Sequence, residues 1–174
     1  GSTTLATSPY RASRYLHRIH GVSVLLVLPQ ALMQSFMLAW LVLGHGWSPV
    51  SAGAVVTVAQ LLGAVGRIVV GVISDRVGSR LTPLRAVAVS VSVGLAVLAA
   101  AEVFGAPGVV AVALAVIATV LSVADNGLAF TAVAEHAGPH WSGRALGVQN
   151  TAQFLAISAI TPVFAAGIDR GGYG

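Results

Sequence analysis

Five apolar stretches, each long enough to cross a lipid bilayer, dominate this chain of 174 residues. They cover residues 21–43, 50–73, 84–103, 108–133 and 145–168. An α-helix rises about 1.5 Å per residue, so about 20 apolar residues span the hydrocarbon core. Because lipid offers no hydrogen bonds to an exposed backbone, such stretches must be helical. The sequence therefore predicts an all-α integral membrane protein with five transmembrane helices.

Charged residues are too few to solvate a soluble domain, since they make up 8% of the chain against about 25% in soluble proteins. The nine basic residues are all arginines spread among the polar links, so no nucleic-acid partner is expected. The chain has no cysteine, and its five histidines lack metal-ligand spacing, so we expect neither a metal nor another cofactor. No nucleophile, base and orienting group stand at a recognisable spacing, so we do not expect an enzyme.

The arginines divide unevenly between the two sides of the membrane. Seven fall on one side, namely Arg11, Arg14, Arg18, Arg76, Arg80, Arg85 and Arg144. The other side holds Arg170, while Arg67 lies within a span. By the positive-inside rule the arginine-rich side is cytoplasmic. We therefore expect a plasma-membrane protein with its N-terminus inside, its C-terminus outside, a cytoplasmic segment over residues 1–18 and an outer tail over residues 169–174.

The link after the second apolar stretch places glycines and charges at fixed spacing. Its pattern G-x-x-x-D-R-x-G-x-R consists of Gly71, Asp75, Arg76, Gly78 and Arg80. Gly71 would let a neighbouring helix approach closely, and Gly78 would supply a positive φ for a tight reversal. Asp75 and Arg76 lie where the chain leaves the hydrocarbon, and Arg80 would hold the link at the inner face.

This pattern resembles the cytoplasmic loop signature of the major facilitator superfamily. Members have twelve helices in two six-helix halves, and the signature follows the second helix of each half, as it does here. The chain resembles helices seven to eleven, which form most of the C-terminal half. By this resemblance, residues 1–18 are the linker between the halves and residues 19–168 a partial helical bundle. The missing N-terminal half of the same chain is then a partner, together with membrane lipid.

Polar residues on four of the predicted helices lie at similar depth. At about 1.5 Å per residue, Gln30 lies ~14 Å from the inner end of its helix, and Asp125 and Gln153 lie ~12 Å from theirs. Arg67 lies ~9 Å from the inner end of the second helix. Transporter sites lie near the bilayer midplane, so we expect a substrate or proton site here. Its candidate residues are Gln30, Gln34, Asp125, Asn126, Asn150 and Gln153.

Asp125 is the sharpest of these candidates, because a charge in hydrocarbon costs at least ~2.5 kcal/mol. It is either a carboxylate that carries a proton or pairs with the substrate, or a structural partner of Arg67. The glutamines also have two interpretations. They are substrate hydrogen-bond donors or bonds between helices, which contribute ~0.6 kcal/mol each. We favour the structural interpretation for Gln149 and the site interpretation for Gln153.

The signature charges form a gate by resemblance, because in this family they hold the inner ends of helices together in the outward-open state. Arg67, on the same helix, and Glu135 complete this gating set. Glu135 is the predicted partner of Arg76 or Arg80. The alternative is a solvated turn that only sets the topology.

These features together predict a secondary active transporter that moves a small solute by alternating access. Proton coupling is a further expectation that rests on Asp125. The alternative is a receptor or scaffold that keeps the fold without transport. Polar groups converging at one depth favour the transporter, since a scaffold does not need them.

Overall fold

The computed structural model describes residues 8–171, with the backbone alone at Asn126. The rest of the expected cytoplasmic segment and of the expected tail lies outside the described residues. The elements are α1 (Pro9–Ala12), α2 (Tyr15–Ala39), the π-helix η1 (Trp40–Gly44), α3 (Pro49–Val77), α4 (Leu81–Val103), α5 (Gly108–Val123), α6 (Asn126–Ala137) and α7 (Ser142–Gly171). Within this range the regular structure is all helical, and five stretches are long and apolar enough to cross a membrane. The predicted all-α class with five spans is confirmed.

The helices differ from the expected spans at their ends and in one interior. Helix α2 begins at Tyr15, inside the segment expected to be a linker, and α7 continues through Asp169, which was expected in the tail. The fourth span, Gly108–Ala137, consists of α5 and α6, which are separated at Ala124 and Asp125. The apolar composition of this span gives no sign of the break, because hydropathy averages over it.

Helix α3 begins and ends where local chemistry dictates. The Ser48 hydroxyl oxygen accepts a hydrogen bond from the Ser51 backbone N–H at 3.1 Å, and Pro49 occupies the first helical position, where its missing N–H costs nothing. At the other end Gly78 adopts φ 65°, the left-handed conformation that glycine adopts readily. The predicted reversal at Gly78 is therefore confirmed.

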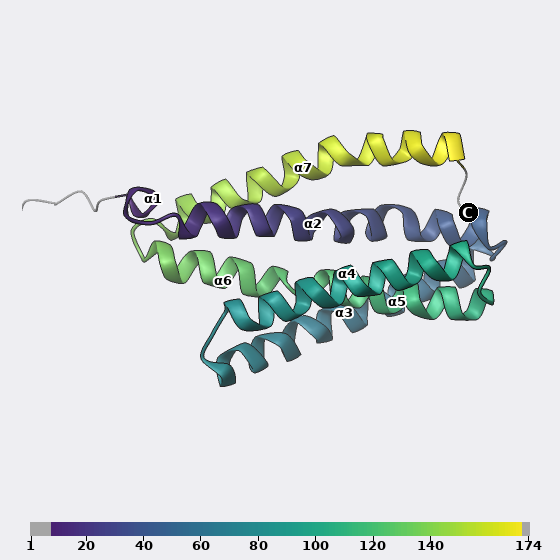
Figure 1. The fold of residues 1–174 in the computed structure, drawn as a ribbon, viewed down its shortest axis with the longest axis horizontal. Helices are drawn as coiled ribbons and strands as arrows, with labels where there is room; N and C mark the ends of the chain where they lie inside the picture. Colours follow the sequence, from purple (N-terminus) through teal and green to yellow (C-terminus); the bar gives the residue numbers. More distant parts are fainter. Residues whose placement is uncertain (1–7, 172–174) are drawn as a thin grey trace, which may run out of the picture.

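The broken span packs against all four other spans, and Figure 1 shows α5 running alongside α3 and α4. Helix α5 packs mainly against α3 and α4, whereas α6 packs mainly against α7 and α2. Half of the residues in an 18-residue apolar stretch of Gly108–Ala137 are buried. In the corresponding stretch of Ser142–Arg170 only 6% are buried. Side chains on the fourth span therefore have the greatest influence on how the other helices are arranged.

Apolar side chains gather in two main clusters, one toward each end of the bundle. We call the end that carries the link between α3 and α4 the signature end. Its cluster includes Leu16 of α2, Leu84 of α4 and Val133 of α6. The cluster at the opposite end includes Leu41 of η1 and Val112 of α5. The polar residues of interest lie between and beside these clusters.

Candidate transport site

The break between α5 and α6 has a local cause in the sequence. The hydroxyls of Thr119 and Ser122 donate to the backbone carbonyls of Ala115 and Thr119, at 2.8 and 2.9 Å. Such bonds compete with the helix ladder and bend helices. Asp125 and the residues that follow it, Asn126 and Gly127, are also weak helix formers. The helix therefore ends at Val123 and restarts at Asn126.

Asp125 lies at this break and is completely buried, with 0% of its surface exposed. Neither carboxylate oxygen has a hydrogen-bond partner among the described residues. Burying a carboxylate without a hydrogen-bond partner is costly, because no hydrogen bond replaces its lost hydration. Hydrogen bonds within the described residues therefore do not account for the burial of this carboxylate.

Arg67 reaches the same break from α3. Its Nε donates to the Val123 carbonyl oxygen at 2.8 Å, and carbonyls in the last turn of a helix lack an intrahelical partner. Among the residues that the structure describes, Arg67 and Asp125 form no ion pair. The Arg67 side chain is exposed, in contrast to Asp125.

Close packing of α3 on α5 is what brings Arg67 to this carbonyl. A Cβ at Gly63 would overlap the Cγ2 methyl of Val123, and one at Gly66 would contact Val120 at 3.5 Å. The close helix approach expected at Gly71 lies instead at Gly63, because no described atom is within 4 Å of a Cβ position at Gly71. Small residues thus do bring the helices together, at Gly63 and Gly66 of α3.

The predicted glutamines and asparagines separate into buried and exposed groups. Gln30 and Gln153 are buried, whereas Gln34 and Asn150 are exposed. The side chain of Asn126 lies outside the described part of the structure. The structure therefore does not gather all six candidates into one pocket.

Two buried glutamines of α7 bond to α2. The Gln153 Nε2 donates to the Ser23 hydroxyl oxygen at 2.8 Å. The Gln149 Oε1 lies 3.0 Å from the His20 Nδ1, and the His20 Nε2 lies 2.9 Å from the Tyr10 hydroxyl. The bond of Gln149 agrees with the structural interpretation favoured for it, whereas its partner His20 and the Ser23 partner of Gln153 were not predicted. The sequence signal is that His20 and Ser23 share one face of α2, and Gln149 and Gln153 share one face of α7, because each pair is three or four residues apart.

The signature end carries a network of charges centred on Arg80. Its Nε and Nη2 donate to the two carboxylate oxygens of Glu135 at 3.2 and 2.9 Å, and its Nη1 donates to Asp75 and to the Ser74 hydroxyl. The hydrogen bond to Glu135, and next in size the one to Asp75, stabilise the charged guanidinium and raise the pKa of Arg80. Of the two predicted partners of Glu135, the structure places Arg80 there. Arg76 is exposed and has no ion-pair partner in the described range.

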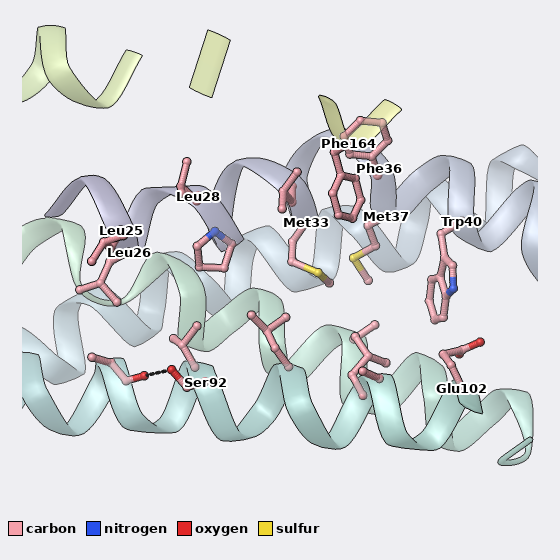
Figure 2. Close-up of a pocket in the computed structure, with 18 of the residues that line it drawn as sticks. Leu25, Leu26, Leu28, Met33, Phe36, Met37, Trp40, Ser92, Glu102 and Phe164 are labelled. Carbon is pink, nitrogen blue, oxygen red and sulfur yellow. Dashed lines mark hydrogen bonds between the residues drawn. The ribbon is translucent and has the colours of Figure 1, made fainter. Parts of the chain in front are cut away.

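A large hollow on the described bundle lies elsewhere. Figure 2 shows this groove of about 1050 Å³, lined mainly by apolar side chains of α2 and α4. Its polar side chains include Ser92, which donates to the Ala88 carbonyl at 2.9 Å, and Glu102, which pairs with His45 at 3.4 Å. Neither Asp125 nor Arg67 lines it. The groove is therefore suited to apolar groups and is separate from the polar residues at the break.

Comparison with known proteins gives a consistent result. The family described as the Major Facilitator Superfamily matches residues 3–161. An uncharacterised MFS-type transporter of Mycobacterium tuberculosis is 49% identical over 166 residues, and a counterpart from a second strain of that organism is 48% identical. Each match covers 95% of this chain. The chain spans 37% of the length of these curated relatives.

No solved structure matches the chain. The family match nevertheless extends over most of the sequence, from the expected linker to the last span, and agrees with five membrane-spanning helices and the signature at the α3–α4 link. The chain belongs to the major facilitator superfamily of membrane transporters.

Proposed function

We propose that the chain forms helices seven to eleven of a secondary active transporter, which moves a small solute across the plasma membrane by alternating access. Family membership and the partial coverage of the relatives support this proposal. In this arrangement the signature end is cytoplasmic, and the exposed apolar faces of α3 and α7 meet lipid or the other half of the transporter. Two six-helix halves then rock around a central site.

The observation that carries a proton-coupled mechanism is the buried, unpartnered carboxylate of Asp125. Intramembrane ionisable residues of this kind form proton relays in pumps and transporters. Binding a proton removes the charge, whereas releasing it creates a charge that needs water or a counter-ion. Protonation at Asp125 thus gives the two conformations of the transporter different energies, which is the requirement for coupling.

At the signature end, Arg80 connects α3 to α6 through Asp75 and Glu135. We propose that these contacts hold the inner ends of the helices together in the outward-open state. Both carboxylates are exposed, so the contacts can break when the halves rock without burying an unpaired charge.

The test of coupling is the variant Asp125→Asn in the full-length transporter, reconstituted in vesicles that contain a pH-sensitive dye. A screen first identifies solutes that drive proton movement through the wild-type protein. The variant should lose this proton movement but keep exchange of labelled solute across the membrane, which needs no net proton transfer. The matched control is Asp169→Asn, which changes an exposed carboxylate near the end of α7 and should behave like wild type. Wild-type proton movement in Asp125→Asn would overturn the proposal.

A further inference from the structure

Arg67 is a charged residue within a span whose charge no described ion pair neutralises. Its Nε is held by the Val123 carbonyl at 2.8 Å, which leaves Nη1 and Nη2 as free donors on an exposed side chain. The described residues provide no further hydrogen-bond partner for these two nitrogens. The guanidinium is therefore anchored at one edge and open at the other.

The anchor fixes the depth of this charge. Val123 lies midway along the span Gly108–Ala137, so the guanidinium is held near the middle of the bilayer. A free arginine escapes hydrocarbon by extending toward the headgroups, but the bond to Val123 prevents this movement. The headgroups lie about 15 Å from the middle of a bilayer, too far for a lipid phosphate to pair with this group. An exposed charge at this depth must face a water-filled path or protein, because facing lipid is too costly.

The two charged residues at the break differ in whether a solute can reach them. Asp125 has no exposed surface, so it cannot pair directly with a solute in this conformation. Arg67 is exposed and positively charged. An arginine with free Nη donors binds the two oxygens of a carboxylate or phosphate in a fixed, planar geometry.

We propose that Arg67 is a substrate-binding residue that recognises an oxyanion, a carboxylate or a phosphate, on a small organic solute. This inference rests on the proposed transport function and specifies its substrate class. The bond to Val123 orients the guanidinium in advance, so little side-chain freedom is lost when the anion binds. The neighbouring proton site at Asp125 suits such a substrate, because a proton moving with the anion compensates its charge.

The test uses the position one helical turn before Arg67. The chain contains no cysteine, and Ala64 is exposed three residues before Arg67 on the same helix face. A single cysteine, Ala64→Cys, is introduced into the full-length transporter with other thiols removed. Its reaction rate is measured in lipid vesicles with anionic sulfonatoethyl methanethiosulfonate and with cationic trimethylammonioethyl methanethiosulfonate. The same ratio of rates is then measured with Arg67→Gln added, and separately with Asp125→Asn added.

The ratio of anionic to cationic rate should fall about tenfold in Arg67→Gln, because a unit charge a few ångströms away acts oppositely on the two reagents. Asp125→Asn should not lower it. Benzoate, used as a probe carboxylate, should slow labelling in the presence of Arg67, whereas benzamide should not. With Arg67→Gln the benzoate effect should disappear.

Each contrary result overturns a defined part of this inference. Absence of labelling at Ala64→Cys would show that this face meets lipid or protein instead of water. An unchanged ratio in Arg67→Gln would remove Arg67 as the source of attraction, and lack of protection by benzoate would reduce the site to a positive potential without oxyanion binding. Labelling does not depend on turnover, so these failures are distinguishable from a failure of transport.

Discussion

Charged residues gather in two regions of the molecule, and the two regions arrange them differently. At the signature end, Arg80 forms hydrogen bonds with both Asp75 and Glu135, and all three side chains are reached by solvent. At the break between α5 and α6, Arg67 and Asp125 carry opposite charges but form no ion pair. At the signature end the opposite charges are thus hydrogen-bonded to each other, whereas at the break the carboxylate is buried, the guanidinium is exposed, and the two form no bond.

The energies explain which region is costly to maintain. An exposed ion pair contributes little to stability, since water already solvates both partners and salt screens them. A buried carboxylate without hydrogen bonds destabilises the folded protein, because its desolvation is not compensated. The arrangement at the break therefore opposes stability, which is typical of residues kept for function.

The largest expected effect comes from removing the buried charge. Asp125→Ala should raise the free energy of unfolding by about 1–3 kcal/mol, the usual cost of an unsatisfied buried polar group, while abolishing coupled transport. Thermal unfolding in detergent, with transport measured in vesicles, checks both effects. Asp169→Ala, on the exposed surface of α7, should change stability by less than about 0.5 kcal/mol. A less stable Asp125→Ala variant would mean that the carboxylate has a stabilising partner after all.

The next effect comes from separating Arg67 from its anchor. Gly63→Val should destabilise the bundle by about 1–3 kcal/mol, because the new side chain overlaps Val123 and pushes α3 away from α5. Gly53→Val, at a position with no atom within 4 Å of a Cβ, is the matched control on the same helix. Equal unfolding temperatures for the two variants would show that the close approach at Gly63 carries no strain.

The features that could be predicted from the sequence are those that depend on short stretches of the chain. The five spans follow from length and hydropathy, and the reversal at Gly78 follows from the positive φ that glycine adopts readily. Such features depend on local properties, which the sequence states directly. The pairing of Arg80 with Glu135 was predicted as one of two options, because both arginines lie at the correct end of the bundle.

The contacts at the break could not be predicted in the same way. The bond from Arg67 to the Val123 carbonyl requires that α5 end at this residue and that Gly63 fit against its side chain. The first condition has a local cause at Thr119 and Ser122 that hydropathy does not show, and the second depends on how two helices pack. The exposure of Gln34 compared with the burial of Gln30 was missed for the same reason, since residues four apart share a helix face but face different neighbours.

A smaller effect is expected at the signature end. Glu135→Gln removes the main partner of Arg80 and should shift the transporter toward its inward-open conformation. Arg76→Ala should also shift it in this direction, but less, because Arg76 has no described ion-pair partner. Cysteine accessibility from each side of the membrane measures the shift. At about 1 M salt, where the screening length is about 3 Å, wild type should approach Glu135→Gln. An equal shift in both variants would refute the central role of Arg80.

The smallest expected effect is at the glutamine hydrogen bonds between α2 and α7. Gln153→Leu removes the bond to Ser23 and should lower stability by about 0.6 kcal/mol, the average for a hydrogen bond between membrane helices. Solute exchange should stay close to wild type if the bond is purely structural. A loss of exchange in a stably folded Gln153→Leu protein would return Gln153 to the substrate site.

The break in the fourth span has a mechanical consequence. It divides one membrane crossing into two segments, since α5 packs mainly with α3 and α4 and α6 mainly with α7, while α2 contacts both segments. If α3 and α4 tilt relative to α7, a crossing interrupted at Asp125 can bend there, whereas an unbroken helix would resist as a single rod. The residue proposed to take up the proton is then also the pivot, so a change in charge and a change in angle occur at the same joint.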